Sequence, residues 1–143
     1  MGKSRAEIVI YVKPDKIVNA ESEYFTYIQG LYKYCLTGRF FVEVPAVEGG
    51  CDDWELNYAI IKHERYLERL GEPDPKSDRG GHYTGTLNQL GYLLKKRGKY
   101  RASLDAFKKL KEFSRKRKTE SLYAYEFDVF IPELEELLKE KQK

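Results

Sequence analysis

Apolar residues recur at helical spacing over most of the chain. They repeat every three or four residues between positions 19 and 36, and again from Asp52 to Leu70. Two further stretches, 84–97 and 100–114, have the same period and meet at Gly98. One apolar face with a period of about 3.6 residues is typical of an amphipathic helix. The pattern therefore predicts four helices, the last two forming an antiparallel hairpin that turns at Gly98.

Polar residues and glycines indicate where these helices begin and end. Asp52 stands three residues before Glu55, which is the spacing of a capping box, and Gly71 follows the second periodic stretch. Thr86 and Gln89 have the same spacing and place the start of the third helix near residue 84.

Other segments have strand character. Residues 7–12 and 40–44 are rich in β-branched and aromatic side chains and predict two short strands. Residues 122–131 fit both an alternating strand pattern and a helical one, so two interpretations stay open. As a helix they give a mainly α fold, and as a strand they give an α+β fold with a small three-stranded sheet. The tail from Pro132 to Lys143 predicts a short acidic helix.

One helical pair carries a repeat signature. The offsets of that signature are occupied by Leu87, Leu90, Gly91, Leu94, Gly98, Tyr100, Ser103 and Phe107. With these residues, 84–115 resembles a tetratricopeptide repeat, although Leu87, Ser103 and Arg115 depart from the usual Trp, Ala and Pro. A second, degenerate hairpin over 118–131 and 133–142 fits the 34-residue period. The length of the chain predicts a single domain, residues 1–143. The resemblance implies helical hairpins within it and a groove that binds a partner protein.

Positive charge is concentrated in residues 95–118. This segment holds twelve Lys and Arg and two acidic residues, a net +10 in a chain whose total is +3. Such a block attracts phosphate backbones or acidic peptides. The alternative is a solvated helix face that acidic neighbours neutralise. The candidate binding residues are Lys95, Lys96, Arg97, Lys99, Arg101, Lys108, Arg115, Lys116, Arg117 and Lys118.

Residues 71–83 hold two of the five prolines and three glycines, which predicts a long loop. Lys76, Arg79 and His82 lie there beside a predicted helix start, and this combination suits a phosphate or another anion. The alternative is a loop with ordinary helix capping.

The sequence offers no set of nucleophile, base and orienting residue, so we expect no catalytic residue, cofactor or metal. His63 begins a metalloprotease-like motif, but Leu67 replaces its second histidine, and a structural role is expected for His63. Cys35 and Cys51 are expected to be unbonded thiols.

No apolar run reaches the roughly 20 residues that cross a bilayer, and residues 1–12 lack the features of a signal peptide. A cytoplasmic location away from membranes is expected. Taken together, the patterns favour a non-enzymatic interaction module that presents a helical groove and a basic surface to a protein or an acidic peptide. Nucleic-acid binding through residues 95–118 is the alternative, and a small enzyme with a site at the 71–83 loop is the third hypothesis.

Overall fold

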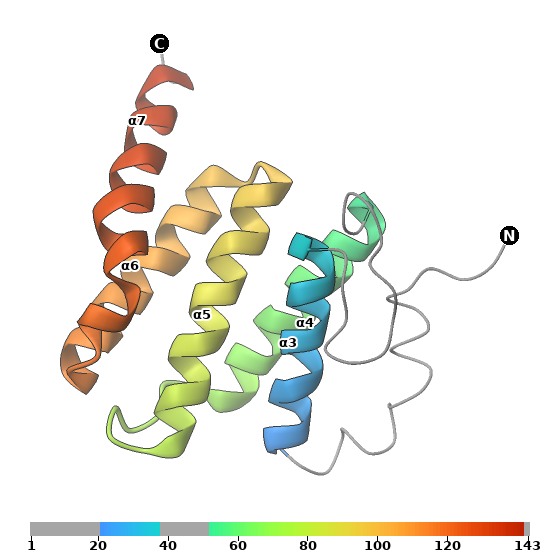
Figure 1. Cartoon of the computed structure of the whole chain (residues 1–143), viewed down its shortest axis with the longest axis vertical. Coiled ribbons are helices and arrows are strands. Elements are labelled where there is room, and N and C mark those ends of the chain that lie inside the picture. Colours follow the sequence, from blue (N-terminus) through green and yellow to red (C-terminus); the bar gives the residue numbers. More distant parts are fainter. Residues whose placement is uncertain (1–20, 38–51, 142–143) are drawn as a thin grey trace, which may run out of the picture. The chain divides into compact units, whose positions relative to one another are not determined.

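The structure is a computed structural model in which residues 21–37 and 52–141 are described. These residues are almost entirely helical and include no strand, which confirms a mainly α fold for this part of the chain. The two strands expected at 7–12 and 40–44 lie outside the described residues. The elements are α3 (Glu21–Thr37), α4 (Asp53–Leu70), α5 (Asp78–Arg97), α6 (Tyr100–Arg117), the 3₁₀ segment η1 (Glu120–Tyr123), the π-helical segment η2 (Glu126–Phe130) and α7 (Ile131–Lys141) (Figure 1).

The chain divides into two compact units, Met1–Lys62 and His63–Lys143. In the first unit, α4 begins with the predicted capping box. The Glu55 N–H donates to Asp52 Oδ1 at 2.8 Å, and the Asp52 N–H donates to Glu55 Oε1 at 3.2 Å. The Tyr34 hydroxyl donates to Glu55 Oε2 at 3.0 Å. The end of α3 is therefore held beside the start of α4 by a buried polar contact.

Cys35 is disulfide-bonded, so the expectation of unbonded thiols was wrong. The sequence holds one other cysteine, Cys51, which lies outside the described residues. The expectation rested on the absence of a targeting signal, whereas the fold brings Tyr34 within hydrogen-bonding distance of Glu55. Disulfides persist in oxidising compartments and also inside hyperthermophilic cells, so the bond by itself does not assign a compartment.

In the second unit, α5 and α6 form the predicted antiparallel hairpin (Figure 1). Gly98 closes α5 in the left-handed conformation, with φ of 86°, and its N–H donates to the carbonyl groups of the last turn. The start of α5 differs from the prediction, because the N-cap is Ser77, whose Oγ accepts from the Gly80 N–H at 3.2 Å. The Thr86 hydroxyl instead donates to the His82 carbonyl at 2.6 Å. The predicted 71–83 loop is therefore only residues 71–77.

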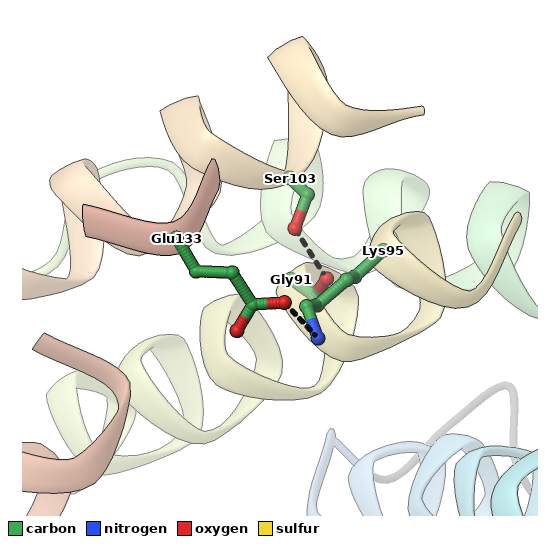
Figure 2. A network of polar contacts seen from close by, with 4 residues as sticks. All are labelled: Gly91, Lys95, Ser103 and Glu133. Atoms are coloured by element: carbon green, nitrogen blue, oxygen red, sulfur yellow. Dashed lines mark hydrogen bonds and ion pairs between the residues drawn. The ribbon is translucent and has the colours of Figure 1, made fainter. Parts of the chain in front are cut away.

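The two helices approach each other closely where Gly91 meets Phe107. A Cβ atom at Gly91 would lie only 2.5 Å from Phe107 Cε1, and the Phe107 side chain is completely buried. Ser103 takes the place of the usual small residue, and its hydroxyl donates to the Gly91 carbonyl at 2.7 Å (Figure 2). The Ser103 hydroxyl and the Gly91 carbonyl thus satisfy each other by a hydrogen bond. Because Gly91 has no side chain, the two helices can pack closely at this point.

The C-terminal segment resolves the open question at 122–131 in favour of helix. Phe127, Ile131 and Leu134 are buried, while Tyr125 and Val129 are exposed, which is the helical and not the alternating pattern. The three-stranded sheet is therefore excluded.

A second hairpin that turns between 131 and 133 is also wrong, since Pro132 is the second residue of α7 and follows η2 directly. Proline there has no N–H and clashes with a carbonyl one turn earlier. The wider π-helical turn accommodates it, with the Ile131 N–H donating to the Glu126 carbonyl five residues back.

Because Cys35 is disulfide-bonded, its removal is expected to lower the stability of the protein. Cys35→Ser should lower the free energy of unfolding by about 3 kcal/mol, the chain-entropy value for closing a loop of roughly 15 residues. Cys51→Ser should cost the same, and the double variant no more than either one, as measured by urea unfolding. Alkylation of the Cys35 thiol in denatured, unreduced protein, detected by mass spectrometry, would contradict the bond.

The contact between Gly91 and Phe107 predicts that substitutions at these two positions have strongly non-additive effects on stability. Gly91→Ala should destabilise by about 1–3 kcal/mol, because the added methyl group displaces an enclosed ring. Phe107→Ala alone should cost about 3–5 kcal/mol. In the Phe107→Ala background, Gly91→Ala should cost nothing or stabilise, since the ring is gone and Ala favours helix by about 1 kcal/mol.

The coupling is measured by a double-mutant cycle in urea, with exposed Arg101→Ala as a control that should stay within about 0.5 kcal/mol. An equal cost of Gly91→Ala in both backgrounds would show that the ring does not set the helix separation.

Candidate functional site

A groove of about 400 Å³ lies within the second unit, between the end of α4, the first half of α5 and the second half of α6. Its apolar lining includes Leu67, which is half-buried, and three buried side chains, Tyr83, Leu87 and Phe113. Its charged lining is exposed and consists of Glu68, Glu72, Lys109 and Glu112. The groove thus has an apolar floor and a rim with a net formal charge of −2. Cavities of this size and composition accommodate side chains of a partner or a small ligand.

Tyr83 is the polar group at the floor of this groove. Its ring packs against that of Phe113 with centroids 4.6 Å apart, and only 6% of the residue is exposed. Burial, and then the nearby carboxylate of Glu72, raises the pKa of the Tyr83 hydroxyl above its usual value of 10.0. The hydroxyl is therefore neutral at pH 7.

Local sequence explains the shape of the groove at its α4 end. Gly71 adopts a φ of 62°, and its N–H donates to the Leu67 carbonyl at 3.0 Å, which ends α4 and turns the chain. Arg117, at the end of α6, then holds the following loop, donating from Nη1 to the carbonyl oxygens of Pro75 at 2.7 Å and Ser77 at 2.8 Å.

The basic residues predicted from sequence do not form one cluster. Lys95, Lys96, Arg97, Lys99 and Arg101 lie at the turn of the hairpin, and Arg115, Lys116, Arg117 and Lys118 lie at the far end of α6. Lys108 lies between the two groups. At 1.5 Å per residue, the groups are separated by about 20 Å along α6. Lys109 and Lys111 also lie between them, so the +10 block of the sequence is spread along α6, with its larger groups at the two ends.

Carboxylates from the acidic segments approach several of these cations. Lys95 Nζ lies 3.3 Å from Glu133 Oε1 of α7 (Figure 2), and Lys108 Nζ lies 3.7 Å from Glu135 Oε2. Further ion pairs join Arg115 to Glu120 and Lys116 to Glu72. Exposed pairs of this kind contribute little to stability, but they reduce the positive field that an anionic partner would experience.

The three residues proposed as an anion site are not gathered around an open loop. Lys76 precedes α5, Arg79 is in its first turn, and His82 lies one turn further on. His82 Nδ1 is 2.9 Å from the Tyr66 hydroxyl, and the guanidinium of Arg117 covers this end of the helix. A Cβ atom at Gly80 would lie 2.9 Å from Arg117 Nη1.

A buried polar contact ties α4 to α5. His63 Nε2 lies 3.0 Å from Gln89 Oε1, and His63 is completely buried. The expected structural role of His63 is consistent with this contact, which satisfies a ring nitrogen that burial would otherwise penalise. Among the described residues, no group of three or more His, Cys, Asp or Glu side chains could hold a metal ion.

A second cavity, of about 440 Å³, lies beside the hairpin turn. Its lining combines exposed Lys99 and Arg101 with half-buried Tyr100, and Leu138 of α7 closes one side.

The residues of the first groove, Glu68, Glu72, Tyr83 and Glu112, were not predicted as a site. They come from three different helices and from the 71–77 loop, and no local motif in the sequence connects them.

The chain matches no protein-family model, no curated protein and no solved structure. No described helix has the length and apolar character that a bilayer crossing requires.

Arg117 is predicted to be structural. Arg117→Gln should lower the free energy of unfolding by about 1–3 kcal/mol, because it removes charge-assisted hydrogen bonds to two backbone carbonyls. Arg115→Gln is the matched control, since Arg115 is exposed and its ion pair with Glu120 is 3.9 Å long. Thermal or urea unfolding measures both. Equal stability of the two variants would mean that Arg117 does not hold the 75–77 loop.

Proposed function

We propose that this protein is a non-enzymatic interaction module of the tetratricopeptide-repeat type, which binds a segment of a partner protein in the groove between α4, α5 and α6. The observation that carries the proposal is the composition of that groove, a buried apolar floor surrounded by exposed charged side chains. Apolar anchors and charged rims are the usual means by which helical surfaces hold a peptide.

The arrangement of the helices supports the repeat type. Gly91, Ser103 and Phe107 make the close contact between the two helices of the hairpin, at the positions where the resemblance places small and aromatic residues. The segment that includes η2 then packs against this hairpin, since Phe130 contacts the rings of both Tyr92 and Phe107. A following helix that packs on both members of a hairpin is the way in which helical repeats extend their core.

Nucleic-acid binding is the second candidate, and the observation that favours it is the group around the second cavity. Lys99 and Arg101 are exposed on either side of Tyr100, and cations that flank an aromatic ring suit a single strand. Salt bridges and the spread of the cations along α6 favour weak binding without sequence preference. A small enzyme at the 71–83 loop has less support, because most of the predicted loop is helical or held by Arg117.

Capture of the partner with matched charge variants tests the proposal. The groove variant is Glu68→Lys with Glu112→Lys, and the control is Glu64→Lys with Glu136→Lys, which changes the charge equally at exposed positions outside the groove. Tagged full-length protein is used for affinity capture from its own cells, followed by quantitative mass spectrometry. A defined partner should be retained by the wild type and by the control, and should fall about tenfold or more with the groove variant.

Two results would contradict the groove as the binding site. One is equal loss of the partner in both variants while circular dichroism shows both folded. The other is capture that nuclease abolishes and that Lys99→Gln with Arg101→Gln removes. Tight binding of one nucleic acid at about 0.15 M salt, where weak electrostatic binding is lost, would place the second candidate first.

A further inference from the structure

We infer that the groove is specific for a basic side chain of the partner, an arginine or lysine whose stem lies on Tyr83, Leu87 and Phe113 while its charged group lies among Glu68, Glu72 and Glu112. This inference rests on the proposed function, because it names the chemistry of the segment that would occupy the same groove.

The charge of the groove differs from that of its surroundings. Three carboxylates and one ammonium group line it, although the segment 95–118, which supplies one of its walls, is strongly basic. Glu72 is also approached by Lys116, but the two charged atoms are 3.8 Å apart and both side chains are more than half exposed. A pair this exposed is weak, and a partner cation can replace it. An acidic segment would instead meet three like charges at the rim.

Tyr83 provides a second, independent reason. Its side chain is more than nine-tenths buried and lines the groove, yet its hydroxyl has no hydrogen-bond partner among the described residues. The oxygen itself is not fully enclosed, so a ligand in the groove can donate a hydrogen bond to it. A guanidinium has five N–H donors, so it can donate to the Tyr83 oxygen and to more than one carboxylate at the same time.

The apolar floor of the groove can contact the methylene stem of an arginine or lysine side chain. The rings of Tyr83 and Phe113 present aromatic surface beside Leu87. Arginine and lysine cover apolar surface with their methylene stems and are attracted to aromatic faces. The volume of about 400 Å³ leaves room for one long side chain and an apolar neighbour.

A set of three small peptides tests the specificity. The probes are acetyl-Leu-X-Leu-amide peptides in which X is arginine, citrulline or glutamate. Citrulline keeps the shape of arginine and removes its charge. Each peptide is titrated into the full-length protein, and NMR shifts of the Leu67 and Leu87 methyl groups give the site and the affinity. The arginine peptide should shift these methyl groups and bind about tenfold more tightly than the citrulline peptide, and the glutamate peptide should be weakest.

Conservative variants identify the groups that bind. Glu68→Gln and Glu112→Gln should each weaken the arginine peptide severalfold and leave the citrulline peptide unchanged, and Tyr83→Phe should weaken the arginine peptide while it preserves the apolar floor. Glu64→Gln, outside the groove, is the matched control. Equal affinity of the arginine and citrulline peptides, binding elsewhere on the protein, or no binding of the arginine peptide would overturn the inference.

These results are separate from the test of the proposed function. A partner that depends on the groove, together with peptides that show no preference for arginine, leaves the interaction role intact and removes the assigned chemistry. If the arginine peptide binds in the groove but capture of the partner is unchanged by the groove variant, the assigned chemistry is kept and the groove is removed as the site of the partner.

Discussion

The close contact between Gly91 and the ring of Phe107 sets the separation of α5 and α6, and other features of the second unit depend on it. Phe107 is enclosed, and its ring also contacts those of Tyr92 and Phe130. The same ring therefore anchors η2, which the Tyr92 hydroxyl holds further by donating to Glu126 Oε1 at 2.7 Å. Two turns along the hairpin, the small separation brings Tyr83 against Phe113 and so forms the floor of the groove. A larger residue at position 91 would disturb both ends, because packed interiors transmit small displacements.

Folding also changes the meaning of the charge pattern. Along the sequence, the basic residues of 95–118 form a block, and the acidic residues of the tail follow it. The basic residues are spread from the hairpin turn along α6, and the return of the chain through α7 places Glu133 and Glu135 near Lys95 and Lys108. Since exposed charges further apart than about 8–10 Å are largely screened in physiological salt, a phosphate backbone would meet a positive field that is spread along the helix and reduced by these carboxylates. The net charge of the chain also gives no indication of the acidic groove.

Local signals predicted the parts of the fold that local interactions determine. The capping box of Asp52 and Glu55 and the turn at Gly98 need only residues within one helical turn, and both were found as predicted. The start of α5 was misplaced because Ser77 and Thr86 are both acceptable caps, and the choice involves Arg117, which lies 40 residues away from Ser77. Residues 122–131 satisfied two periodicities, and contacts of Phe127 and Phe130 with other elements favour the helical one. The groove was not predicted, because its residues converge from three helices and a loop.

The arrangement of opposite charges around the groove would constrain how the proposed partner approaches. Glu72 on the rim lies next to Lys116, and Arg115 and Lys118 follow on the same end of α6. Under the proposed function, a segment with a cation in the groove and an anion that reaches the end of α6 would meet attraction at both positions, whereas the reversed segment would meet repulsion. Discrimination then comes from the unfavourable orientation as much as from the favourable one. The net charge of +3 is therefore a poor guide to binding, because the partner responds to the local order of charges along the surface it covers.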